Sequence, residues 1–230
     1  MLFNEKQTPA KKQFIHAVFI PALISILFVL VFVFERGMGW DFHKAGIVPR
    51  DINQIWGIFT YIFIHADPGH LANNTISFLI LSTCLYYFYK DIASGIMFLS
   101  WLISGILLWT IGRDSYHIGA SGWIYALAFF LFLSGIVRGH VPLIAISLVI
   151  TFWYGGMIWH VFPWKINDPI SWEGHLSGAV AGGILTFIYR KKGPQKPVKI
   201  WEEDDTDDFE NYDINFGDTD ENEQISEEAK

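Results

Sequence analysis

Long apolar runs alternate along the chain with short breaks that are polar or rich in glycine and proline. Each run has about 16 to 21 residues, and a helix that rises about 1.5 Å per residue needs about 20 residues to cross a bilayer core of about 30 Å. The pattern therefore predicts six membrane-spanning helices in an all-α bundle. They are expected at residues 14–34, 70–89, 93–111, 121–137, 141–161 and 174–189.

Composition supports a membrane protein, because 52% of the residues are hydrophobic and 17% are aromatic. The charge is distributed unevenly. Residues 1–200 hold 15 Lys and Arg against 9 Asp and Glu, whereas residues 201–230 hold 1 Lys against 14 acidic residues. We expect a cytoplasmic segment at 1–13, a membrane domain at 14–190 and a basic, then acidic, disordered tail at 191–230.

Basic residues predict the orientation. With the N-terminus inside, ten Lys and Arg fall in inner segments and five in outer loops, which predicts that both termini are cytoplasmic. The only cysteine, Cys84, lies in an apolar run and excludes an intrachain disulfide and a cysteine-based metal site. We expect no metal, no cofactor and no nucleic-acid partner. The sequence does not fix the oligomeric state.

Ser121 begins the fourth predicted span, in the stretch HIGASGWIYA. This span is about 25 Å long against a core of about 30 Å, so the preceding loop must dip into the membrane. Gly119 and Gly122 let the backbone turn tightly there. Free N–H groups and the positive end of the helix dipole then lie beside the Ser121 hydroxyl and suit a bound anion. On this stretch alone, a plain N-cap serine is the simpler interpretation.

His175 lies one residue into the sixth predicted span. Gly174, Gly178 and Gly182 recur there every four residues, the small-xxx-small pattern of closely packed membrane helices. A neighbouring helix can therefore approach the imidazole, and a serine needs such a base in order to act as a nucleophile. A histidine that is hydrogen-bonded to a carbonyl is the alternative.

Further polar residues fall near the outer ends of the spans. His70 and Asn74 share a helix face and both donate hydrogen bonds, as an oxyanion requires. Tyr125 lies one turn after Ser121, where its ring can stack on an imidazole, and His65 lies one loop before His70. Taken singly, each residue also fits helix solvation, loop bracing or ordinary packing. Because polar side chains are costly in lipid, their gathering at one depth indicates a functional site.

This set of motifs resembles the rhomboid family of intramembrane serine proteases over residues 50–190. GASG matches the family's G-x-S-G, which implies that Ser121 is the nucleophile. The last span matches H-x-x-G-x-x-x-G, which implies that His175 is the base in a Ser-His dyad. The second span matches H-x-x-x-N, which implies that His70 and Asn74 join the Ser121 backbone N–H in an oxyanion hole.

The resemblance has further implications. Tyr125 would stack on the catalytic histidine, His65 would be a structural loop residue, and transmembrane segments of other membrane proteins would be the substrates. The protein would be integral to a bacterial inner membrane, with its active site near the outer leaflet. The glycines that would support the site are Gly119, Gly122, Gly178 and Gly182.

Some positions depart from the family or extend it. Trp56 is followed by Gly57 where many members have arginine, so loop bracing differs or Arg50 serves instead. Glu173 is expected to point away from His175, so that no acid completes a triad. A substrate would enter past the fifth span, whose Gly155 and Gly156 allow bending, and loop 162–172 would act as a lid. Ordinary packing and interfacial anchoring explain these last features as well.

Two other classes of protein remain as alternatives. A catalytically inactive rhomboid-like protein would bind membrane proteins for quality control, but such relatives typically lack the serine or the histidine. A small transporter would place its polar residues near the middle of the membrane at broken helices. Here the polar residues cluster at the outer ends of the spans, which favours the protease.

Overall fold

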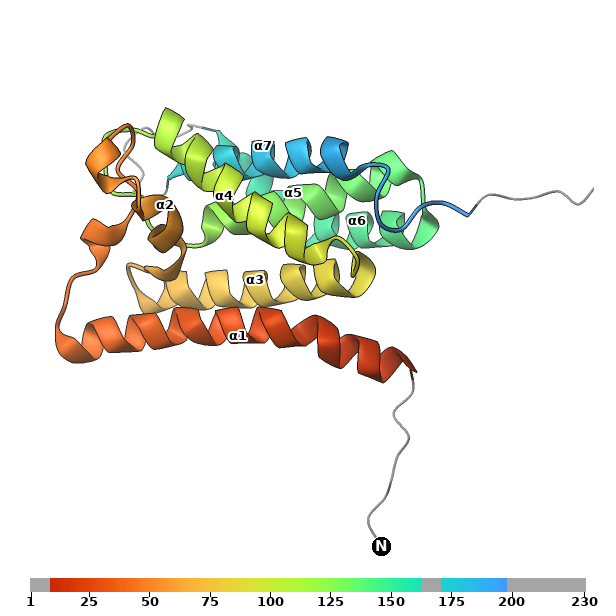
Figure 1. The fold of residues 1–230 in the computed structure, drawn as a ribbon, viewed down its shortest axis with the longest axis horizontal. Coiled ribbons are helices and arrows are strands. Elements are labelled where there is room, and N and C mark those ends of the chain that lie inside the picture. Colours follow the sequence, from red (N-terminus) through yellow and green to blue (C-terminus); the bar gives the residue numbers. More distant parts are fainter. Residues whose placement is uncertain (1–8, 163–170, 198–230) are drawn as a thin grey trace, which may run out of the picture. The chain divides into compact units, whose positions relative to one another are not determined.

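The computed structural model describes residues 9–162 and 171–197, and these residues form helices and loops without a β-strand (Figure 1). The long helices are α1 (Pro9–Met38), α3 (Pro68–Phe88), α4 (Ala93–Ile111), α5 (Ser121–Arg138), α6 (Val141–Tyr154) and α7 (Trp172–Tyr189). A short α2 (Gly57–Thr60) and 3-10 turns at His43–Ala45, Ile52–Gln54, Tyr61–Phe63 and Gly155–Val161 complete the described part. The all-α prediction is therefore confirmed.

The six long helices follow the six predicted spans. Within the described residues, α1, α4 and α5 are long and apolar enough to cross a membrane, and α6 is a shorter apolar helix. The fifth span differs from its prediction, because α6 ends at Tyr154 and the chain continues to Val161 as a 3-10 helix. The pair Gly155–Gly156 stands at this change, and glycine is a poor former of α-helix. Most of the predicted tail (198–230), the start of the N-terminal segment and most of the lid lie outside the described residues.

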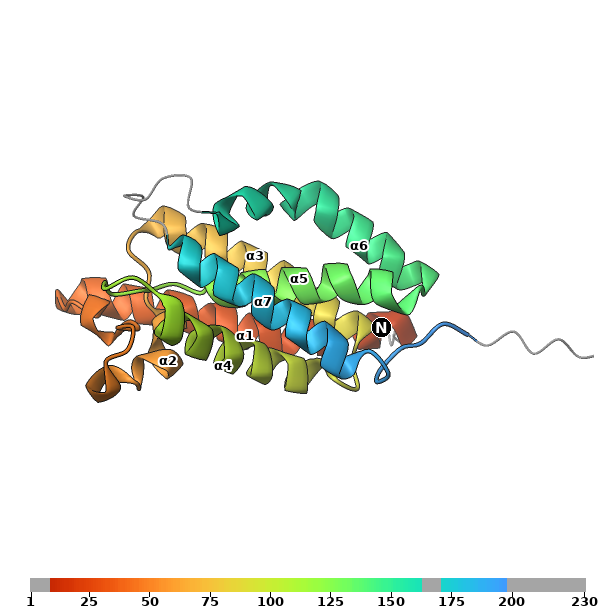
Figure 2. The same cartoon turned by 90° about the horizontal axis from the view of Figure 1, so that it is seen from above.

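Helix α5 occupies the centre of the bundle. It packs against α3, α4, α6 and α7, and α1 packs against α3. Figure 2 shows α4 and α6 on opposite sides of the α5–α7 pair. Trp123 joins α5 to α4, since its indole N–H donates to the Met97 carbonyl at 3.0 Å and to Ser100 Oγ at 2.9 Å. These two hydrogen bonds give a structural reason for the tryptophan that follows the Ser121–Gly122 pair.

Helices α5 and α7 meet along a row of glycines. A Cβ on Gly178 would overlap the Gly122 carbonyl oxygen, and one on Gly182 would overlap the Ala126 carbonyl oxygen. The two backbones therefore touch, as the glycine spacing on α7 predicts for packed membrane helices. We call this contact the glycine seam.

The N-termini of α3, α5 and α7 lie at the same end of the bundle (Figure 1). Asp67 caps α3, because its Oδ1 accepts the backbone N–H groups of Gly69 at 2.8 Å and His70 at 2.9 Å. These bonds, that of His70 most, lower the pKa of the Asp67 carboxyl. Ser171 caps α7 in the same way, whereas the start of α5 has no side-chain cap, so the first N–H groups of α5 are the ones left as donors at this end of the bundle.

Candidate active site

A cavity of about 700 Å³ opens at the end where α3, α5 and α7 begin. It brings together five of the residues that the sequence singled out, from three helices. Those residues are Ser121, His175, His70, Asn74 and Tyr125. Asn73, which the helical spacing places off the face shared by His70 and Asn74, lines the same cavity, so the expectation that it points elsewhere was wrong.

Ser121 is the first residue of α5 and is half-buried. The backbone that leads to Ser121 is shaped by Gly119, which has a φ of +101° and donates its N–H to the Tyr61 carbonyl at 2.8 Å. The first helical bond of α5 runs from the Ile124 N–H to the Ala120 carbonyl at 3.0 Å. The N–H groups at the start of α5 precede this bond and lie beside the Ser121 hydroxyl.

His175 is buried in the first turns of α7, and its ring orientation is fixed from two sides. Its Nδ1 lies 3.0 Å from the His160 carbonyl oxygen, which can only accept, so Nδ1 carries the proton in this bond. In the neutral ring, Nε2 is then the basic nitrogen. The ring also stacks on Tyr125, with centroids 4.2 Å apart and an angle of 6° between the planes. Because Tyr125 lies one turn after Ser121, the stack holds the imidazole against the Ser121 end of α5.

His70 and Asn74 lie against the loop that leads to Ser121. A Cβ on Gly119 would stand 2.7 Å from His70 Nε2 and 3.3 Å from Asn74 Nδ2, so only glycine fits there. Asn74 Nδ2 is buried and has no hydrogen-bond partner among the described residues. A buried amide donor without a partner is costly, and such a group is usually satisfied by water or by a ligand.

His65 is buried beneath this pair and does not line the cavity. Its ring packs between Phe28 of α1, at 5.6 Å, and His70, at 5.1 Å between centroids. The side chain therefore supports His70 by contact and ties the cavity floor to α1.

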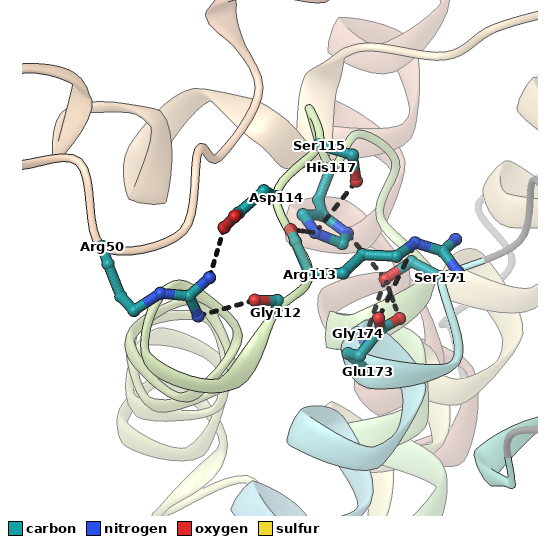
Figure 3. Close-up of polar contacts among 9 residues, drawn as sticks. All are labelled: Arg50, Gly112, Arg113, Asp114, Ser115, His117, Ser171, Glu173 and Gly174. Carbon is teal, nitrogen blue, oxygen red and sulfur yellow. Dashed lines mark hydrogen bonds and ion pairs between the residues drawn. The ribbon is translucent and has the colours of Figure 1, made fainter. Parts of the chain in front are cut away.

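Arg50 braces the loop between α4 and α5 (Figure 3). Its Nη1 donates to the Gly112 carbonyl at 2.7 Å, and its Nη2 forms an ion pair with Asp114. Gly57 has no room for a side chain, because a Cβ there would overlap the Gly46 carbonyl oxygen. An arginine at position 57 is therefore excluded, and Arg50 supplies a guanidinium to a different loop.

A second polar network joins the same loop to the start of α7, and little in the sequence indicates it. His117 Nδ1 lies 2.8 Å from Ser171 Oγ, which also accepts the Gly174 backbone N–H at 3.0 Å as the N-cap of α7. Glu173 is buried and pairs with Arg113 (Figure 3). The expectation that Glu173 points away from His175 did not include this pairing with Arg113. The serine three residues before Gly174 was the one available signal, since it predicts a cap.

Burial lowers the pKa of His117, so its ring is neutral near pH 7. Its Nε2 lies 3.0 Å from the Arg113 carbonyl oxygen and 3.4 Å from Ser115 Oγ. Since the carbonyl can only accept, Nε2 carries the single proton and Nδ1 accepts the hydroxyl proton of Ser171. His117 thus has a structural bond at each nitrogen.

Comparison with known proteins identifies the family of the chain. A family model described as Rhomboid domain matches residues 52–192. An uncharacterized protein of Mycobacterium tuberculosis is 32% identical over 174 residues, which cover 70% of each chain. Rhomboid-related protein 2 of Mus musculus is 26% identical over 203 residues, covering 78% of this chain and 67% of the relative. Rhomboid-related protein 1 of Caenorhabditis elegans is 32% identical over 147 residues, which cover 61% of this chain and 41% of the relative.

The matched region contains every α-helix that lines the cavity, and it ends just after α7. The helices are those of a membrane protein, and the family model covers more than half of the chain. The chain is an integral membrane protein that belongs to the rhomboid family.

Proposed function

We propose that this protein is an intramembrane serine endopeptidase that cleaves transmembrane segments of other membrane proteins. The observation that carries the proposal is the cavity that Ser121, His175 and Asn74 line together, with Asn74 Nδ2 lacking a partner among the described residues. A nucleophile, a base and an oxyanion donor are the three parts that acyl transfer by serine requires. The family to which the chain belongs supports the same reaction.

Ser121 Oγ attacks the carbonyl carbon of the scissile peptide, and His175 Nε2 takes the hydroxyl proton. His175 then gives that proton to the leaving nitrogen as the C–N bond breaks, and an acyl-enzyme remains on Ser121. Water hydrolyses the ester by the reverse proton path and releases the second product. The His160 carbonyl supports this role, because it holds the Nδ1 proton and leaves Nε2 to act as the base.

Negative charge that develops on the substrate oxygen is stabilised by three donors. They are the Ser121 backbone N–H, Asn74 Nδ2 and His70 Nε2. Gly119 allows His70 and Asn74 to approach, because a Cβ at Gly119 would crowd both side chains. Donors that are already fixed in place cost no reorganisation during the reaction, which makes them effective in catalysis.

The substrate reaches the cavity from the membrane, past α6. Phe152 and Trp153 near the end of α6 are 90% and 73% exposed, so these side chains face the lipid from which a substrate would come. The substrate helix must unwind locally to present a peptide carbonyl. The protein sits in a bacterial inner membrane, with both termini in the cytoplasm and the cavity near the outer leaflet.

Cleavage of a transmembrane substrate by the purified protein in detergent tests the proposal. Wild-type protein should cut the substrate within or next to its membrane segment, whereas Ser121→Ala and His175→Ala should remain folded and not cut. Normal cleavage by Ser121→Ala would refute the nucleophile. A wild-type protein that binds the substrate but never cuts it would support a rhomboid-like binding protein instead.

A further inference from the structure

Glu173 carries a buried carboxylate that the proposed hydrolysis does not use. It lies in the first turn of α7, two residues before His175, and is 3% exposed. Its Oε1 lies 3.7 Å from Arg113 Nε, and its Oε2 lies 3.4 Å from Ser171 Oγ. Because burying a charge is costly unless the charge is paired, Arg113 is the partner that keeps this carboxylate at the start of α7.

Ser171 lies beside this carboxylate and binds the loop that leads to the nucleophile. Its hydroxyl lies closest to His117 Nδ1, at 2.8 Å, and donates there because His117 is neutral and protonated on Nε2. Its oxygen accepts the Gly174 N–H at 3.0 Å. One side chain therefore caps α7 and holds the preceding loop, and Figure 3 shows it between His117 and Glu173.

The two ends of this link have the same offset from the proposed dyad. His117 lies four residues before Ser121, and Ser171 lies four residues before His175. The first turn of α7, a rigid helix, connects Ser171 to His175. From His117 the path to Ser121 is also fixed, because His117 exchanges two backbone hydrogen bonds of 2.9 Å with Ile47.

The glycine seam alone does not set the position of α7 along its axis. Glycines have no side chains that interlock. A contact between them fixes the separation of two helices, but it resists sliding and rotation of one helix against the other only weakly. Reacting groups must be held within about 0.5 Å of their productive positions. Directional bonds at the outer ends of α5 and α7 supply that restraint, and the Arg113–Glu173 pair adds a second point of attachment beside Ser171.

We propose that Arg113, His117, Ser171 and Glu173 form a clamp that holds Ser121 and His175 in register. The four are positioning residues, and none of them takes part in proton transfer. The clamp rests on the proposed function, because its effect is a change in the rate of the reaction at Ser121. Its role is to set kcat rather than substrate affinity.

Ser171 provides the first test, by comparison of Ser171→Ala with Ser171→Thr. Ser171→Ala should lower kcat for a transmembrane substrate about tenfold to a hundredfold, as a small misplacement of reacting groups does, and should leave KM unchanged. Ser171→Thr keeps the hydroxyl and should restore most of kcat. The rate is expressed per folded molecule, measured by circular dichroism and size exclusion.

Asp114→Asn is the matched control. Asp114 lies next to Arg113 and forms an ion pair of its own, but with Arg50 on the other side of the loop, and its side chain is 89% exposed. This substitution should leave kcat and KM at wild-type values. A loss of kcat equal to that of Ser171→Ala would mean that any change in the loop slows the enzyme, and the clamp would be refuted.

Arg113 and Glu173 provide a second test that does not depend on the folding of Ser171→Ala. Arg113→Gln and Glu173→Gln should each lower kcat, and the double variant should be no slower than the slower single variant, because both remove the same contact. Additive losses, a wild-type rate in Glu173→Gln, or equal losses in Ser171→Ala and Ser171→Thr would overturn the clamp. If the wild type itself does not cleave while Ser121 is intact, the proposed function fails, whatever these variants do.

Discussion

Helix α5 meets α7 and α6 in different ways. Against α7 it is joined along the whole glycine seam, and a Cβ on Gly178 or Gly182 would strike backbone. Against α6 it is joined closely in the half nearer their connecting turn, where Ser147 Oγ donates to the Phe132 carbonyl at 2.8 Å and Gly135 leaves no room for a side chain. Beyond that point α6 diverges, as Figure 2 shows.

This difference separates two tasks. In the proposed reaction, the α5–α7 pair carries Ser121 and His175, which need fixed positions, whereas α6, which borders the cavity through Tyr154, would let a substrate in. Local stability varies within one molecule, and segments with few buried contacts open most easily. We therefore expect substitutions in the seam to affect folding and rate, and substitutions at the C-terminal end of α6 to leave the fold intact.

The largest effect is expected from Gly178→Ala in the seam. Its new methyl group would overlap the Gly122 carbonyl oxygen and force the helices apart, which costs about 1–3 kcal/mol or more. Thermal unfolding in detergent should show the loss of stability, and cleavage should fall with it. Gly183→Ala is the control on the same helix, because its Cβ would have only Leu133 Cδ1 near it, at 3.8 Å. Equal melting temperatures for the two variants would contradict the seam.

Asn74→Ala should give the next largest effect, on rate alone. Removing one oxyanion donor lowers kcat by about 100- to 1,000-fold. Because Asn74 Nδ2 has no partner among the described residues, its loss breaks no hydrogen bond there, and the melting temperature should hold or rise. Steady-state cleavage kinetics check this result. A wild-type kcat would remove Asn74 from the oxyanion hole.

Tyr125→Ala should slow cleavage less, about two- to tenfold, which corresponds to the loss of one aromatic stack. The imidazole of His175 would keep its bond to the His160 carbonyl but lose the surface that holds it flat. Tyr125→Phe keeps the ring and should stay closer to the wild-type rate. If the alanine and phenylalanine variants are equally slow, the ring stack is not what matters.

Gly156→Ala, beyond the end of α6, should have the smallest effect. A Cβ there would meet nothing within 4 Å, and replacing an unstrained glycine changes stability by less than about 1 kcal/mol. The melting temperature should stay near that of the wild type or rise slightly. A loss as large as that of Gly178→Ala would mean that α6 is as tightly packed as the seam.

The sequence predicted much of this organisation because its signals were local. Apolar length located the helices, the four-residue glycine spacing located the seam on α7, and the His175 and Ser121 motifs located the two sides of the cavity. The end of α6 was placed too late, because a continuous apolar run does not show where an α-helix gives way to a 3-10 helix at Gly155.

Contacts between loops and helix starts were the least predictable part. The periodicity of α7 shows where Glu173 points relative to His175, but not that Arg113 of another loop lies there. In the same way, the absence of space at Gly57 depends on the Gly46 carbonyl, which belongs to a separate turn. Such pairs depend on how distant segments pack, and no local pattern records them.

Reaction of the protein with a fluorophosphonate, followed by mass spectrometry, tests the central claim most directly. This probe forms a covalent adduct with a serine only where a base activates the hydroxyl and the site admits the phosphorus centre. We predict one adduct on Ser121 in the wild type and a rate of labelling that collapses in His175→Ala while the protein stays folded. Labelling of Ser121 at the wild-type rate in His175→Ala, or no labelling of Ser121 in the wild type, would contradict the account.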